Sequence, residues 1–160
     1  MATDIHLLAD ATGQVDAAVV AYSNSLTPPA VNVLAAQLAN ALKVARPRVR
    51  DMTVGTDAAM HRQLKKFVER ARVAVQLLVD AAGDESWDVS PDTLALQLID
   101  LLDATVAVKD HTDSMQRGHA GSIGADMTWL RVALPDLRAN FTKYCDEVDA
   151  LLLRVAPNAP

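Results

Sequence analysis

The strongest pattern in the chain is a repeat of apolar residues along its last long segment, residues 125–155. Successive apolar residues there lie three or four positions apart, which places them on one face of an α-helix. They are Leu130, Leu134, Leu137, Phe141, Cys145, Val148, Leu152 and Val155. A single apolar stripe of this length is typical of a helix packed in a bundle, so we expect a long amphipathic helix here.

Four earlier segments repeat the same spacing, at about residues 4–26, 28–52, 56–82 and 90–115. The fourth of them carries its expected stripe at Leu94, Leu98, Leu101, Thr105, Val108, Thr112 and Met115. The pattern therefore predicts five helices in all.

Short turn signals separate these segments. Thr27 and Ser90 each precede a proline, which is the order of a capping hydroxyl and a first helical residue. Gly83 follows the third segment, as a C-terminal glycine usually does. Pro47 predicts a kink or an end in the second helix, and Pro135 predicts a kink in the last one.

Composition supports a helical bundle. Of the 160 residues, 51% are hydrophobic but only 4% are aromatic, which disfavours sandwiches and barrels rich in aromatic and β-branched residues. Short connections favour antiparallel neighbours. We predict an all-α, antiparallel up-down bundle of four to five long amphipathic helices. We expect one domain over residues 1–156 and a frayed tail or the start of a linker at 157–160.

Several functional classes are disfavoured by charge and composition. The net charge of −5 argues against a nucleic-acid binder. No apolar run is long enough for a transmembrane segment, and no signal peptide is recognisable, so we expect a cytoplasmic protein. The single cysteine, Cys145, lies on an apolar stripe between acidic neighbours and is interpreted as a core residue.

Catalytic and metal-binding motifs are missing. Carboxylate-bridged metal bundles use paired Glu-x-x-His motifs, and the chain has only three glutamates and no such pair. Asp100 and Asp103 flank the apolar stripe of their helix and are interpreted as a solvated face. We therefore expect no enzyme activity, no metal and no cofactor. A histidine phosphotransfer bundle is an alternative, with His61, His111 or His119 as the phosphate acceptor, although none has the Lys and Gly that follow the acceptor in that family.

Charge is distributed unevenly along the chain. Residues 43–72 hold nine of the fifteen basic residues but only three of the twenty acidic ones. Helical geometry places some of these cations on common flanks of the second and third helices. If these helices are neighbours, a basic rim borders the groove between them. The candidate partner-binding residues are Lys43, Arg46, Arg50, Arg62, Lys65 and Arg72.

Such a groove would suit an acidic, leucine-rich amphipathic helix, whose leucines enter the groove while its carboxylates meet the rim. Three alternatives stay open. The basic residues could form an ordinary solvated face of a structural, self-associating bundle. They could bind an anionic lipid surface. The third is the histidine phosphotransfer bundle.

At the level of fold, the chain resembles the helical bundles of cytoskeletal adhesion proteins: focal-adhesion-targeting domains, talin-rod modules and vinculin-type bundles. Ala-, Leu- and Val-rich helices over the whole chain carry the resemblance. So does a local segment in which Thr27-Pro28-Pro29 precedes a helix with Leu34, Leu38 and Leu42 and a basic C-terminal half. The focal-adhesion-targeting family has a similar proline-containing turn, and basic residues border its grooves for acidic leucine-rich motifs. The resemblance implies a non-catalytic scaffold or adaptor in cell adhesion. That family usually has four helices, whereas five suit a talin-rod module better.

Overall fold

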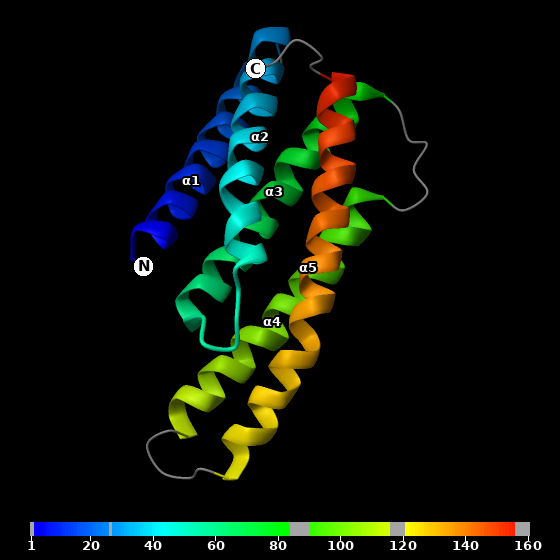
Figure 1. Cartoon of the computed structure of the whole chain (residues 1–160). Helices are drawn as coiled ribbons and strands as arrows, with labels where there is room; N and C mark the ends of the chain where they lie inside the picture. Colours follow the sequence, from blue (N-terminus) through cyan, green and yellow to red (C-terminus); the bar gives the residue numbers. More distant parts are fainter. Residues whose placement is uncertain (1, 26, 84–89, 116–120, 156–160) are drawn as a thin grey trace.

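The chain folds into five α-helices that pack against one another, as the computed structural model shows for residues 2–25, 27–83, 90–115 and 121–155 (Figure 1). The helices are α1 (Ala2–Ser25), α2 (Pro28–Arg50), α3 (Ala58–Ala82), α4 (Pro91–Met115) and α5 (Gly121–Val155). Successive helices run in opposite directions. The predicted all-α up-down bundle is therefore confirmed. The expected tail at 157–160 lies outside the described residues.

Local signals explain most of the helix boundaries. Ser90 caps α4 by accepting a hydrogen bond at its Oγ from the backbone N–H of Thr93, at 3.1 Å. Thr27 precedes α2 in an extended conformation without a side-chain cap bond, so its hydroxyl does not act as the predicted cap. Gly83 ends α3 with a left-handed φ of 66°, a conformation that glycine adopts without steric cost.

Both internal prolines are accommodated within helices. α2 continues through Pro47 to Arg50, so the proline does not end the helix. α5 contains Pro135 and begins at Gly121, earlier than the expected residue 125.

Four helices, α1, α2, α3 and α5, form one arrangement, and α4 is added to it. α1 packs against α2 and α3, and α5 packs against α2, α3 and α4. α2 and α3 touch only slightly because they lie diagonally across this arrangement. α4 packs against α3 and α5 on one side of it. The end of α4 and the start of α5 continue together past the other helices, at the lower end of Figure 1.

The core is made by the predicted stripes. The α5 residues of its stripe are all buried except the half-buried Val155. Phe67 of α3 and Phe141 of α5 make a tilted ring contact with centroids 6.4 Å apart. In α4 the predicted residues Leu94, Leu98, Thr105 and Thr112 are buried, but at two positions the next residue along is buried instead: Leu102 and Lys109 are buried, whereas Leu101 and Val108 are half-buried. The shift arises because α4 packs against both α3 and α5 and turns its face between them.

The loop between α2 and α3, residues 51–57, is held by two cations from distant helices. Lys109 of α4 donates from Nζ to the carbonyl oxygen of Val54 at 3.1 Å, and Arg138 of α5 donates to the carbonyl of Met52. Both acceptors are backbone groups that no helix satisfies. These two bonds fix the loop, and with it the start of α3, against α4 and α5.

No helix in the described ranges is both long and apolar enough to cross a membrane.

Candidate partner-binding groove

The six predicted binding residues do not lie together. Lys43, Arg46 and Arg50 are on α2 and line a groove shared with α5. Arg62, Lys65 and Arg72 are on α3 and pair with carboxylates of α4. The predicted groove between the second and third helices is therefore wrong. Because α2 and α3 are diagonal, α1 and α5 occupy the positions on either side of them.

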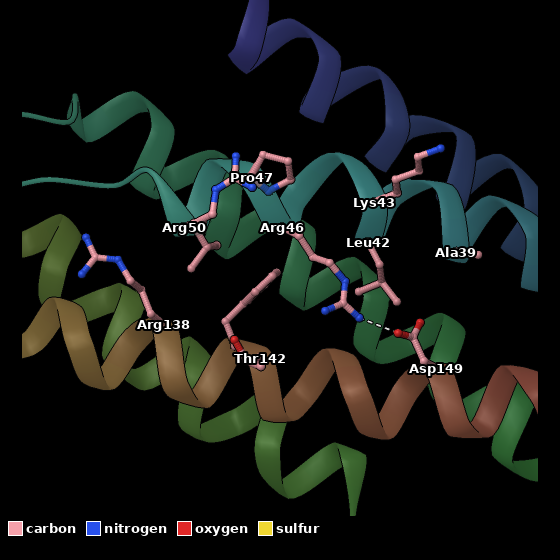
Figure 2. A pocket seen from close by; sticks show the side chains of 11 residues that line it. Ala39, Leu42, Lys43, Arg46, Pro47, Arg50, Arg138, Thr142 and Asp149 are labelled. Carbon is pink, nitrogen blue, oxygen red and sulfur yellow. Dashed lines mark hydrogen bonds and ion pairs between the residues drawn. The ribbon is translucent and has the colours of Figure 1, made fainter.

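The groove that α2 does form runs along α5 and has a volume of about 700 Å³, which is within the usual range for ligand pockets (Figure 2). We call it the α2–α5 groove. Its floor is apolar and includes the buried side chains of Leu42, Val49 and Phe141. Its lining residues are Ala39, Leu42, Lys43, Arg46, Pro47, Val49, Arg50, Arg138, Phe141, Thr142 and Asp149.

Four cations and one carboxylate surround this apolar floor. Arg46 crosses the groove to Asp149, with Asp146 also 3.9 Å from its guanidinium (Figure 2). Among the described residues, Arg50 pairs only with its neighbour in sequence, Asp51, at 3.0 Å, and both side chains are exposed. The hydrogen bond to Asp51 raises the pKa of Arg50. One of the four charges is thus neutralised across the groove, and a second is paired locally at the edge.

The other two cations have no carboxylate partner among the described residues. Lys43 is exposed on α2. Arg138 reaches toward the α2–α3 loop, and its Nε is buried without a hydrogen-bond partner. Figure 2 shows that Lys43 and Arg50 extend on the side of α2 away from α5, so their charges mark the outer edge of the groove. The groove therefore combines an apolar floor with unneutralised positive charge.

Arg138 is a groove residue that the sequence analysis missed. It lies outside the basic segment 43–72, in a helix where acidic residues predominate, so the charge count did not reveal it. The sequence nevertheless contains a signal for this residue. Arg138 lies one residue after Leu137 and three before Phe141, at the edge of the apolar stripe. A cation at that position lies next to the neighbouring helix.

The α3 cations form a ladder of ion pairs with α4. Arg62 pairs with Asp110, Lys65 with Asp103 and Arg72 with Asp92. The partner numbers decrease as the α3 numbers increase, as antiparallel packing requires. The hydrogen bond to Asp103 raises the pKa of Lys65, and the one to Asp92 raises that of Arg72.

Two more cations of the basic segment pair with α1, Arg48 with Asp4 at 3.0 Å and Arg70 with Asp16 at 3.7 Å. Together with the ladder, these pairs give the uneven charge distribution a structural role. The basic segment faces helices that supply the acids.

The histidines differ in their access to solvent. His61 is fully buried in the α3–α4 interface, and burial together with the nearby charge of Lys109 lowers its pKa to about 4. A phosphoryl donor cannot reach His61 in this conformation. His111 is exposed, and its Nδ1 lies 2.5 Å from Oδ2 of Asp126. His119 lies outside the described residues.

Metal and thiol chemistry find little support in the part of the chain that the structure describes. No group of three or more His, Cys, Asp or Glu side chains there could hold a metal ion. Cys145 is buried, and burial raises the pKa of its thiol to about 12. At neutral pH the thiol is protonated and has the character of a core side chain, in agreement with its position on the α5 stripe.

Comparisons with known proteins return no relative. No model of a protein family matches the chain, and neither the curated proteins nor the solved structures contain a match to it. Nothing in these comparisons links the chain to focal-adhesion-targeting, talin-rod or vinculin-type bundles. That resemblance stays a prediction, carried by the amphipathic helices and the proline turn alone.

Proposed function

We propose that the protein is a non-catalytic protein–protein interaction module that binds an acidic amphipathic helix in the α2–α5 groove. One observation carries the proposal: the residues that line the groove combine an apolar floor with four cations and a single carboxylate. Apolar side chains of the partner would enter over Leu42 and Phe141. Its carboxylates would meet Lys43, Arg50 and Arg138. In this arrangement the charges orient the partner helix, and contact with the apolar floor provides the affinity.

The spacing of the α2 cations defines the partner. Lys43 and Arg50 are seven residues apart in one helix, so their backbone positions are separated by about 10.5 Å along its axis. A partner helix laid along α2 would match them with carboxylates seven residues apart, and with leucines between them. Arg46 already holds Asp149, so a third carboxylate would have to compete with this internal pair.

The remaining parts of the proposal follow from the sequence. The fold-level resemblance supports a scaffold or adaptor that works with adhesion or cytoskeletal proteins. The single cysteine, buried in the core, supports a cytoplasmic setting because the chain needs no internal disulfide. Each of these assignments would be tested by identifying the partner that the groove selects.

An amide-shift NMR titration tests the groove. The ¹⁵N-labelled protein is titrated with a helical peptide that carries glutamates seven residues apart and leucines between them, at low and at physiological salt. We expect saturable shifts confined to Lys43–Arg50 and Arg138–Asp149. Absent shifts, or weak shifts spread over the molecule and removed by modest salt, would reject the proposal.

A matched pair of variants separates the groove from overall charge. Lys43→Glu and Lys66→Glu change the net charge equally, but Lys66 is an exposed residue of α3 that does not line the groove. We expect Lys43→Glu to weaken peptide binding roughly fivefold and Lys66→Glu to leave it nearly unchanged. Equal effects would indicate nonspecific charge attraction.

Three further measurements address the alternatives. Binding to vesicles with anionic lipid, with no binding to the peptide, would support the lipid-binding alternative. A concentration-dependent mass in sedimentation, again without peptide binding, would support a self-associating structural bundle. Phosphate incorporation that is lost on replacement of His111 or His119 would support phosphotransfer.

A further inference from the structure

A second pocket lies on a different side of α5, among α3, the start of α4 and α5. Its volume is about 300 Å³, and it shares no lining residue with the α2–α5 groove. Its walls are largely apolar and include Val75 and Val79 of α3, Pro91 of α4 and Tyr144 of α5. It is therefore a separate site that the proposed docking function does not use.

The polar groups at the edge of this pocket already have partners. Arg72 and Asp92 form a two-point ion pair, with Nη2 and Oδ2 3.2 Å apart. Gln76 donates to Asp80 at 3.0 Å, and the Ser90 hydroxyl accepts the cap bond of α4. The rim thus presents paired groups whose charges cancel, and it offers little attraction to an ion.

The Tyr144 hydroxyl is the exception. The side chain is fully buried, it lines the pocket, and its hydroxyl has no hydrogen-bond partner among the described residues. Buried tyrosine hydroxyls usually have a partner, because leaving one unpaired opposes folding. Burial also raises the pKa of Tyr144, so the hydroxyl remains a neutral donor and acceptor. A ligand that supplies one hydrogen-bonding atom would satisfy this group.

We propose that this pocket binds a small, uncharged and mainly apolar ring compound whose single hydrogen-bonding group pairs with the Tyr144 hydroxyl. The size follows from the volume. An apolar cavity of about 150 Å³ holds benzene, so about twice that volume suits a bicyclic ring. The absence of charge follows from the closed Arg72–Asp92 pair, and the single polar atom follows from the one buried, unpaired hydroxyl among the residues that line the pocket.

Two probes that differ only in a hydroxyl test the proposal. 2-Naphthol carries one hydrogen-bonding group, and naphthalene has the same rings without it. Binding is followed by NMR of the methyl groups of Val75 and Val79. We expect both probes to shift these methyls saturably and 2-naphthol to bind more tightly.

The Tyr144→Phe variant should weaken 2-naphthol about two- to tenfold and leave naphthalene unchanged, because it removes one hydrogen bond. Tyr22→Phe, on α1, is the matched control and should change neither affinity. If Tyr144→Phe weakens both probes equally, or neither, the assigned hydrogen bond is wrong.

A second pair of variants tests whether the probes bind in this pocket and leaves Tyr144 in place. Val79→Phe narrows the pocket and should abolish binding of both probes, whereas Val132→Phe, on an exposed part of α5, should preserve it. Circular dichroism checks that each variant keeps its helices. If the wild-type protein shows no saturable methyl shift with either probe, the pocket holds only water and the proposal is overturned.

Discussion

The Nδ1 atom of His61 on α3 lies 3.0 Å from Oγ1 of Thr105 on α4, within the buried interface of the two helices. The Thr105 hydroxyl donates its own hydrogen to the carbonyl of Leu102 at 2.9 Å. Its oxygen is therefore the acceptor from His61, and Nδ1 carries the proton in the neutral ring. Protonation would add a charge at Nε2, which is buried without a partner among the described residues, near the ammonium of Lys109.

This environment makes the free energy of unfolding depend on pH. Burial and Lys109 lower the pKa of His61 from 6.5 to about 4 in the folded state. As pH falls, the unfolded chain binds the proton first, so stability from this residue is complete above about pH 6.5 and is lost progressively toward pH 4. The loss amounts to roughly 3 kcal/mol.

Urea unfolding between pH 5 and pH 7.5 measures this effect. His61→Leu should remove most of the pH dependence in that range, because the titrating group is gone. His111→Gln, which replaces an exposed histidine, should retain it. A wild-type protein with pH-independent stability over the range would show that the pKa of His61 is the same in the folded and unfolded states, and would overturn this prediction.

The bond from Lys109 to the loop gives a second prediction. Lys109→Met keeps an apolar stem but leaves the Val54 carbonyl without its donor, so we expect a loss of about 1–3 kcal/mol of stability. Removing this positive charge should also raise the pKa of His61. Urea unfolding measures the first effect, and NMR titration of the imidazole measures the second. Lys66→Met, at an exposed site, should change neither by much; a similar loss there would exclude the loop bond as the cause.

Apolar spacing was sufficient to predict the helices but not their neighbours. The α5 stripe is buried almost as predicted because that spacing depends only on helical geometry. Two positions of the α4 stripe were displaced by one residue, since Leu101 and Leu102 are equally apolar and the choice between them depends on where α3 and α5 lie. Lys109 was missed for the same reason.

Half of the predicted binding residues line one groove. Lys43, Arg46 and Arg50 do so because they are spaced along a single helix, and their role in binding stays a prediction. The prediction that α3 forms the other side of this groove was wrong. The loop of residues 51–57 is long enough to place α3 diagonally from α2. Charge counting could not distinguish a free cation from one that is paired across helices. Arg62 is exposed on the surface but is paired with Asp110.

The buried thiol of Cys145 gives a third prediction. Burial raises its pKa to about 12, and the thiolate is the reactive form, so the folded protein should resist thiol reagents. We expect labelling by an aromatic disulfide to be roughly a hundredfold or more slower than in the urea-unfolded chain, because the reaction requires opening of the core.

A pair of alanine variants provides the control for thiol labelling. Phe141→Ala removes a ring that packs in the same helix and should lower stability by about 3–5 kcal/mol and accelerate labelling. Val132→Ala, at a position 68% exposed, should not accelerate it. Rapid labelling of the wild-type protein at neutral pH would mean that α5 opens without global unfolding.

The ladder between α3 and α4 gives the last prediction, and it separates paired from available cations. Lys65 and Asp103 are partly exposed, so a double-mutant cycle with alanine at both positions should give a coupling energy of at most about 1 kcal/mol, smaller still at roughly 0.5 M salt. Urea unfolding of the four proteins measures it.

Exchanging the charges with Lys65→Asp and Asp103→Lys together should recover much of the stability that either reversal loses. Because these α3 cations already have carboxylates, the same exchange should leave binding of an acidic peptide unchanged. If it abolished binding, the partner surface would lie on α3 and α4 rather than in the α2–α5 groove.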